Sequence, residues 1–114
     1  MVLKDDFYHI TKQDGRHFEV TMNASHAIYS GHFPGRPITP GACLLQMTQE
    51  LLSLAEGQPI RLAGVKNLKF VALHTPDKPV CVDFTEKGNG EFQMVIADSE
   101  TIYAKMICAV HIED

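Results

Sequence analysis

The chain has 114 residues, of which 45% are hydrophobic and 21% charged, and its formal net charge is -4. This balance is typical of a globular domain and excludes intrinsic disorder, and the length predicts one domain spanning residues 1–114. The negative charge argues against nucleic-acid binding. No run approaches the roughly 18 apolar residues of a membrane helix, and residues 1–6 turn acidic instead of forming a signal-peptide core. We therefore expect a cytoplasmic protein without membrane insertion.

Two strands are predicted first, followed by a rigid loop. Residues 7–10 and 17–22 have strand composition, and the Lys12–Gly15 segment between them is a turn signal. Residues 30–41 then contain three prolines and three glycines. Because proline fixes φ and removes a hydrogen-bond donor, neither a helix nor a central strand runs through this loop.

A long helix is predicted over Ala42–Glu56, a segment without proline or glycine. Thr39 is the expected N-cap, Pro40 the first helical residue, and Gly57 the residue that ends the helix. Most of its circumference is apolar and is expected to be buried. The polar residues form one stripe along the helix: Gln46, Gln49, Glu50 and Ser53.

Strands account for the rest of the chain. Residues 60–71, 80–85, 92–97 and 101–112 have strand composition, and a turn signal lies at residues 87–90. Because the connections are short, these four strands are expected to form an antiparallel meander. One helix against an antiparallel sheet is an α+β architecture.

The cysteines and histidines suggest no metal site or disulfide framework. Cys43, Cys81 and Cys108 form no C-x-x-C pair, lie among apolar neighbours, and are expected in the core. The histidines have no metal-ligand spacing, and His26 is interpreted as a turn residue. Residues 61–84 form a basic segment in an acidic chain, with Arg61, Lys66, Lys69 and Lys78 against two aspartates.

The most specific stretch is residues 31–41, Gly-His-Phe-Pro-Gly-Arg-Pro-Ile-Thr-Pro-Gly. Its proline and glycine residues restrict where the His32 imidazole can lie, and the following helix start offers free N–H groups and a positive dipole end. Such an arrangement can hold a carbonyl oxygen while His32 removes a neighbouring proton. A structural histidine within its own loop is the alternative.

This stretch resembles the signature of the 3-hydroxyacyl-[acyl-carrier-protein] dehydratases of the FabZ type: His-Phe-Pro-Gly-x-Pro, then Pro-Gly, then a long helix. The resemblance implies the hotdog fold, with one helix wrapped by a curved antiparallel sheet, and active sites at a dimer interface. It also implies that His32 is catalytic and that the Gly41 N–H binds the thioester carbonyl. Pro40, Ala42 and Phe33 are expected to line the substrate site, Phe33 packing under the loop, and Tyr29 the acyl entrance.

Two helix residues depart from the family pattern. The family has glutamate five residues after the Pro-Gly glycine and glutamine four residues later, whereas this chain has Gln46 and Glu50 there. Three interpretations follow. In the first, Glu50 replaces the missing carboxylate from one helical turn away, because the Gln46 amide can hydrogen-bond the substrate hydroxyl but cannot exchange protons. In the second, His32 and a water suffice for a slower dehydration or an easier substrate. In the third, the fold binds an acyl chain or carrier protein without catalysis, or supports a catalytic partner as half of a heterodimer.

The predicted function is therefore dehydration of (3R)-hydroxyacyl thioesters in fatty-acid or polyene/polyketide-type synthesis. Acyl binding without catalysis and thioester hydrolysis through Glu50 are the alternatives. The reaction needs no metal, nucleotide or flavin, so no cofactor is expected. The expected partners are an acyl carrier protein, docked through Arg36, Lys66 and Lys69, and a second copy in a homodimer or a higher oligomer of dimers.

Overall fold

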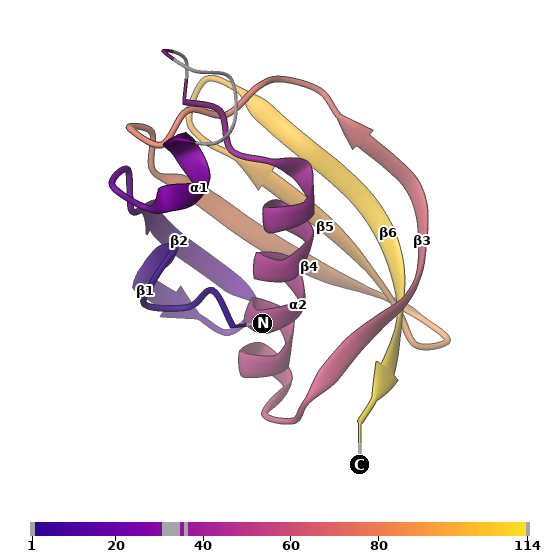
Figure 1. The fold of residues 1–114 in the computed structure, drawn as a ribbon. Helices are drawn as coiled ribbons and strands as arrows, with labels where there is room; N and C mark the ends of the chain where they lie inside the picture. Colours follow the sequence, from indigo (N-terminus) through magenta and orange to yellow (C-terminus); the bar gives the residue numbers. More distant parts are fainter. Residues whose placement is uncertain (1, 31–34, 36, 114) are drawn as a thin grey trace.

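The computed structural model describes residues 2–30, 35 and 37–113. Figure 1 shows one long helix, α2, lying along the inner face of a curved sheet. This is the α+β hotdog arrangement that the sequence predicted, and it is confirmed. The elements in chain order are β1 (Tyr8–Asp14), β2 (His17–Met22), α1 (Ala27–Ser30), α2 (Gly41–Glu56), β3 (Ile60–Phe70), β4 (Val80–Gly88), β5 (Glu91–Ala97) and β6 (Ile102–Ile112). The short helix α1 was not predicted.

The six strands form one antiparallel sheet in the order β1-β2-β4-β5-β6-β3. The prediction of a four-strand meander is correct for β4, β5 and β6 but wrong for β3, which lies at the far edge beside β6. The connection over residues 71–79 is long enough to cross from that edge to β4 on the other side of β5 and β6. Backbone bonds from Val71 and Ala72 to the Tyr103 carbonyl hold its first residues against β6.

The core lies between α2 and the concave face of the sheet. Alternate residues of β2, β4 and β5 point into it, as the burial of Phe18, Val82 and Met94 shows, and Met47 and Leu51 meet them from the helix. The same alternation corrects one prediction about the cysteines. Cys43 and Cys108 are buried as expected, but Cys81 is only half-buried because it lies between two inward-facing valines of β4.

The ends of α2 agree with the sequence at one end and differ at the other. Gly57 ends the helix with φ of 69°, a left-handed conformation that favours glycine, and its N–H bonds to the Leu54 carbonyl. At the start, Pro40 is the N-cap and the predicted N-cap, Thr39, does not cap. The Thr39 hydroxyl instead contacts His74 and Tyr29.

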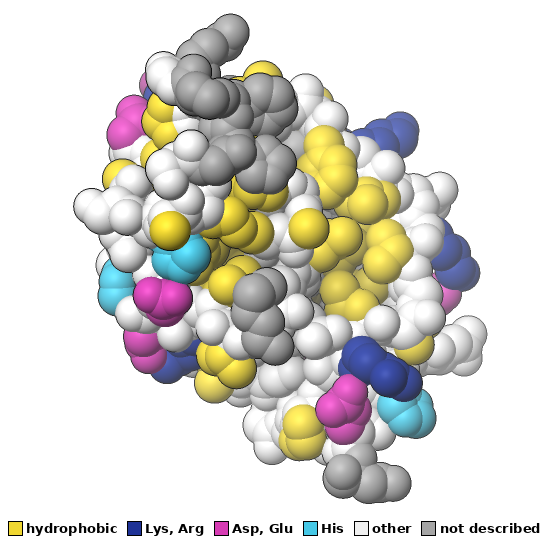
Figure 2. All heavy atoms as spheres, viewed as in Figure 1, with side chains coloured by type: hydrophobic (Ala, Val, Ile, Leu, Met, Phe, Trp, Pro, Cys, Tyr) yellow, Lys and Arg dark blue, Asp and Glu magenta, His cyan; other side chains and the backbone are white. Residues whose placement is uncertain are grey.

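One face of the molecule leaves apolar side chains exposed. Figure 2 shows hydrophobic side chains gathered over α2 and toward β3, in the same view as Figure 1. The exposed apolar residues of the β3 edge and its continuation include Val65, Phe70, Val71 and Leu73, the last with 68% of its surface exposed. Large exposed apolar patches on soluble proteins usually mark an interaction surface.

Candidate functional site

The polar stripe of α2 lines a cleft of about 480 Å³ on the outward side of the helix. The N-terminal segment at Val2 and Lys4 forms one wall, and the turn into β3 at residues 58–60 forms another. The prediction that these four polar residues share one face of the helix is therefore confirmed. The four residues are half-buried and divide into two pairs with different partners.

Gln49 and Ser53 join the helix to the start of β3. The Gln49 side-chain oxygen accepts the Leu62 N–H at 2.9 Å, and the Ser53 hydroxyl accepts the Ile60 N–H at 2.9 Å. Ser53 also lies within donor distance of the Gln49 and Ile60 carbonyls. These contacts satisfy backbone groups at the turn between the two elements, which is a structural role.

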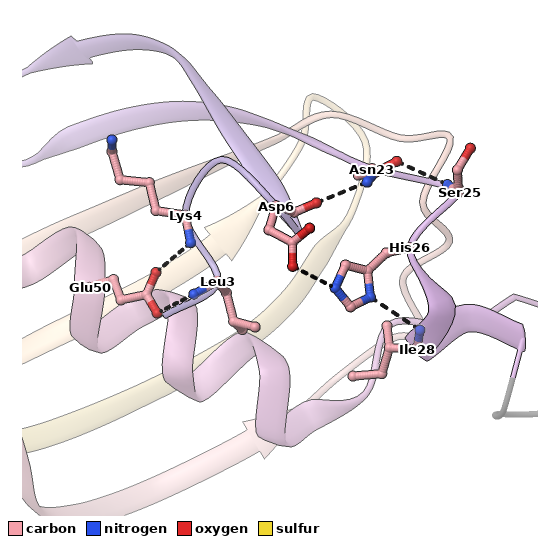
Figure 3. Close-up of polar contacts among 8 residues, drawn as sticks. All are labelled: Leu3, Lys4, Asp6, Asn23, Ser25, His26, Ile28 and Glu50. Carbon is pink, nitrogen blue, oxygen red and sulfur yellow. Dashed lines mark hydrogen bonds and ion pairs between the residues drawn. The ribbon is translucent and has the colours of Figure 1, made fainter. Parts of the chain in front are cut away.

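Glu50 accepts hydrogen bonds from four donors. Its Oε2 accepts the Leu3 N–H at 2.7 Å and the Gln46 amide at 2.9 Å, and its Oε1 accepts the Lys4 N–H at 2.8 Å and the Tyr8 hydroxyl at 3.0 Å. Figure 3 shows the two backbone contacts. Burial and then the adjoining Glu50 carboxylate raise the pKa of Tyr8, so Tyr8 remains a donor. Glu50 thus anchors the N-terminal segment to α2.

Gln46 lies one helical turn before Glu50 and is in direct contact with it. The bond from Gln46 Nε2 to Glu50 Oε2 fixes which way the Gln46 amide faces: its nitrogen toward Glu50 and its carbonyl oxygen away. An amide oxygen accepts a hydrogen bond but does not exchange protons as a carboxyl does. The Gln46 side chain can therefore form hydrogen bonds, but it cannot supply a proton.

The start of α2 provides a second group of site residues. Cys43 and Leu44 donate the first helical hydrogen bonds, both to the Pro40 carbonyl. The N–H groups of Gly41 and Ala42 precede this ladder and have no intrahelical acceptor. The helix start is therefore suited to bind a polarised carbonyl oxygen.

An apolar cleft of about 440 Å³ opens beside these N–H groups. Pro40, Gly41 and Ala42, all predicted to bind substrate, line it together with Phe70 and Leu73. The Phe70 ring is so close that a Cβ on Gly41 would lie 2.7 Å from it. Sequence reasoning missed Phe70 and Leu73, because no local pattern indicates that the end of β3 folds over the helix start.

Three predicted residues, His32, Phe33 and Arg36, lie outside the described residues. Tyr29 is described, and the prediction that it lines the acyl entrance is wrong. Its side chain is buried, stacks on Phe7 with ring centroids 5.5 Å apart, and bonds to Thr39. Tyr29 points into the core because α1 packs against the N-terminal segment.

His26 has the turn role that the sequence indicated. Its Nδ1 accepts the Ile28 N–H at 3.1 Å, so its Nε2 is the nitrogen that faces the Asp6 carboxylate, also at 3.1 Å. Figure 3 shows that these contacts join the start of α1 to the N-terminal segment, and that Asn23, in the connection between β2 and α1, donates to the Asp6 carbonyl. The contacts of His26 and Asn23 with Asp6, and those of Glu50 with Leu3 and Lys4, hold the N-terminal segment against the rest of the fold.

The basic segment does not form one patch. Arg61 faces Glu113 at 3.7 Å and Lys66 pairs with Glu91 at 2.5 Å, so both have an acidic neighbour within the chain. Lys69 lies opposite Lys105 of β6, beside a shallow cleft of about 250 Å³. Of the predicted docking residues that are described, Lys69 thus has the more positive surroundings.

Two negative findings concern the described residues alone. Within residues 2–30, 35 and 37–113, no group of three or more His, Cys, Asp or Glu side chains is placed to hold a metal ion. Across the same part of the chain, no helix has the length and apolarity needed to cross a membrane.

Comparison with known proteins identifies the family. Residues 9–106 match the family described as ApeI-like, ApeI dehydratase, so the chain belongs to the ApeI-like dehydratase family. A curated relative, the 3-hydroxyacyl-[acyl-carrier-protein] dehydratase FabZ of Chloroflexus aggregans, is 27% identical over 105 residues, covering 81% of this chain and 73% of the relative. The expected kinship to dehydratases of hydroxyacyl thioesters is therefore confirmed at the level of the family.

Solved structures support the fold. The dehydratase heterocomplex ApeI:P from Xenorhabdus doucetiae contains a chain that superposes with a TM-score of 0.72 at 13% identity, covering 90% of this chain and 93% of that one. A hypothetical thioesterase with coenzyme A from Streptococcus pneumoniae TIGR4 superposes with a TM-score of 0.64, also at 13% identity, covering 97% and 92%. At these identities the likeness is one of fold, shared by dehydratases and thioesterases.

Proposed function

We propose that this protein dehydrates (3R)-hydroxyacyl thioesters carried on acyl carrier protein to trans-2-enoyl thioesters, in fatty-acid or polyene/polyketide-type synthesis. The observation that carries the proposal is the dehydratase-family match over residues 9–106. The helix start at Gly41, whose N–H groups precede the helical hydrogen bonds and adjoin an apolar cleft, supports it because a thioester needs both a carbonyl site and room for an acyl chain.

In this scheme His32 removes a proton from the carbon next to the thioester, and the Gly41 N–H binds the carbonyl oxygen on which charge develops. The electron pair of the broken C–H bond forms the new double bond as the bond from the β-carbon to the hydroxyl oxygen breaks. Gln46 orients that hydroxyl. Because Gln46 cannot supply a proton, a water molecule protonates the leaving hydroxide and takes back the proton that His32 removed from carbon, so that one water is released in total.

The second candidate is an acyl-binding subunit without catalysis. The four donors on Glu50 favour it, because a carboxylate that holds the N-terminal segment is not available to replace the missing acid. The same contacts argue against thioester hydrolysis, in which Glu50 would have to activate a water. In both the dehydratase and the acyl-binding subunit, Glu50 therefore has a structural role.

The principal experiment is hydration of a trans-2-enoyl thioester, presented on a carrier protein and on a small thiol and followed by loss of enoyl absorbance. Parallel detection of free thiol separates dehydratase chemistry from hydrolysis. His32→Ala should lower the hydration rate by roughly 10²–10⁴-fold. His9→Ala is the matched control, because His9 is an exposed residue of β1 that faces Asp5. Near-full activity of His32→Ala would contradict the proposed mechanism.

Gln46→Glu separates the two candidates. It brings a second carboxyl against Glu50, where Gln46 now donates at 2.9 Å, and the adjacent carboxylate favours the protonated form of the introduced side chain. That proton gives a dehydratase site the acid it lacks, and hydration should rise by up to about 10²-fold. If the wild type and Gln46→Glu are both inactive on all chain lengths tried, the acyl-binding subunit is the better assignment.

A dimer is the proposed working form. The apolar residues exposed along β3 and over α2 would be buried by a partner subunit, and obligate dimers often bury about 2,000 Å² or more. The partner we propose is a second copy. The solved Xenorhabdus assembly is a heterocomplex, so a different hotdog chain is the alternative. Light scattering at micromolar concentration decides: a dimer supports self-association, and a monodisperse monomer contradicts it.

Carrier-protein docking is proposed to use Lys69, Lys66 and Arg36. Lys69→Glu should raise the KM for a carrier-borne substrate without changing that for the small-thiol substrate, and the difference should shrink with salt. Lys66→Glu should have the smaller effect, because Glu91 already neutralises Lys66. If the double variant leaves carrier-dependent turnover and its salt dependence unchanged, docking does not use this strand.

A further inference from the structure

A chain of hydrogen bonds between buried side chains joins three separate segments beside the start of α2. The Tyr29 hydroxyl of α1 lies 3.0 Å from Thr39 Oγ1, which lies 2.7 Å from His74 Nδ1 in the β3–β4 connection. His74 Nε2 lies 2.6 Å from the Lys78 carbonyl oxygen. Tyr29, Thr39 and His74 are exposed by only 5%, 5% and 2%, so water does not compete for these bonds.

The directions of the bonds follow from the last bond of the chain together with the charge of His74. A carbonyl oxygen only accepts, so His74 Nε2 carries a proton and donates it to Lys78. A neutral ring then has a bare Nδ1, which accepts from the Thr39 hydroxyl. The Thr39 oxygen in turn accepts from the Tyr29 hydroxyl. This direction belongs to a neutral His74, because a charged ring would donate from Nδ1 and would turn the Thr39 hydroxyl toward Tyr29 instead.

The surroundings of His74 favour that neutral state. Burial lowers the pKa of His74, and the nearby Lys78 charge acts in the same direction. The carboxylates of Asp77 and Asp98 and the bond to the Lys78 carbonyl oppose it more weakly than burial promotes it. The ring of Tyr103 packs edge-on against the imidazole with centroids 4.9 Å apart, which adds apolar contact rather than charge.

Thr39 is the member of the chain that reaches the site. Its N–H donates to the His74 carbonyl at 2.8 Å, so its backbone and its side chain are both held by His74. Thr39 immediately precedes Pro40, whose ring fixes φ, and Gly41, so the placement of Thr39 sets where the first turn of α2 begins. Thr39 and His74 also line the apolar cleft beside Gly41.

We propose that Thr39 and His74, supported by the hydrogen bond from Tyr29 to Thr39, are positioning residues that hold the Gly41 N–H in place for the thioester carbonyl. This inference rests on the proposed function, because it concerns the same carbonyl site. The bond between Tyr29 and Thr39 also ties together the two ends of the segment that carries His32 in the sequence. None of the three is a catalytic residue in this scheme; they act through the helix start.

The test compares Thr39→Val, which keeps the shape but removes the hydroxyl, with Thr39→Ser, which keeps the hydroxyl. We expect Thr39→Val to lower kcat/KM for enoyl-thioester hydration by about 10- to 100-fold, since small displacements of positioned groups have effects of that size. Thr39→Ser should restore most of the activity. Thr85→Val, on the exposed face of β4, is the matched control and should behave as the wild type. A packing role alone predicts the opposite order, with Thr39→Val the more active variant.

The pH profile supplies a readout that packing does not move. Removing the Thr39 hydroxyl takes away the donor that favours a neutral His74, so His74 protonates more easily. The acid limb of the Thr39→Val profile should therefore shift to higher pH, while that of Thr39→Ser stays with the wild type. Equal profiles for all three proteins, or equal kcat/KM, would overturn the positioning role.

Nitrogen NMR of the imidazole keeps this inference separate from the proposed function. The network predicts a His74 that is protonated at Nε2 and bare at Nδ1 at neutral pH; the reverse tautomer or a charged ring would refute it. If the wild type hydrates no enoyl thioester, the proposed function fails, and affinity for an unreactive 3-hydroxyacyl pantetheine amide becomes the readout. Weaker binding by Thr39→Val than by Thr39→Ser then supports the positioning role, and equal binding overturns it.

Discussion

Replacing Glu50 by glutamine tests whether this residue anchors the N-terminal segment or takes part in chemistry. The substitution keeps size and shape but turns one of the two oxygens into an NH₂ group. If the NH₂ replaces Oε2, the Leu3 N–H loses its acceptor whatever the Gln46 amide does. If it replaces Oε1, Tyr8 can turn its hydroxyl, but the Lys4 N–H loses its acceptor. Either way one backbone donor is left without a partner.

The size of the effect follows from that count. An unsatisfied buried donor costs about 1–3 kcal/mol, and this site is half-buried, so we expect the free energy of unfolding to fall by about 1–2 kcal/mol. For a chain of this length that corresponds to a fall in Tm of about 4–8 °C. Glu56→Gln is the matched control on the same helix. Its partner Arg16 lies at a partly exposed surface, so the loss should be at most about 1 kcal/mol.

The assay is thermal unfolding followed by circular dichroism, at one fixed protein concentration because a dimer would make Tm depend on concentration. Hydrogen exchange should additionally show faster exchange at the Leu3 and Lys4 amides in Glu50→Gln. If Glu50→Gln abolishes turnover while Tm and the exchange of these amides stay unchanged, Glu50 is the catalytic carboxylate and the anchoring argument is wrong.

Three further measurements test other parts of the structure. Gly41→Ala should displace the half-exposed Phe70 ring with little change in Tm but lower the hydration rate, and an unchanged rate would argue against a carbonyl site at this glycine. Because burial lowers the pKa of His74, the stability it contributes should be full above its unfolded pKa of about 6.5 and be lost as pH falls through the lower native value; His74→Gln should flatten this part of a Tm–pH curve. The Asp83 hydrogen bond raises the pKa of His17, so Asp83→Asn should bring the NMR titration of His17 toward lower pH, and an unmoved titration would contradict the assignment.

Local chemistry was sufficient to predict most of the elements. The segment before Gly57 was predicted as a helix that ends there, and the left-handed φ of 69° at Gly57 explains why glycine stands at that position. The alternation of apolar residues identified the strands, and the four polar residues of α2 predicted a single stripe because helical periodicity places them on one face. These features depend on neighbours within a few residues, which is the range over which sequence patterns are informative.

Long-range contacts decided what the sequence left open. The sequence offered Glu50 as a replacement acid, but its four donors include two backbone amides more than 40 residues away, and no local pattern indicates them. Thr39 had the right type for an N-cap, yet its hydroxyl contacts the buried His74, 35 residues later, instead of the helix start. The edge position of β3 and the contact of Phe70 with Gly41 arise in the same way. The sequence determined which polar side chains line the candidate site. Only the folded chain determined which of them are already bound to other parts of the protein, because hydrogen-bond partners are set by three-dimensional proximity.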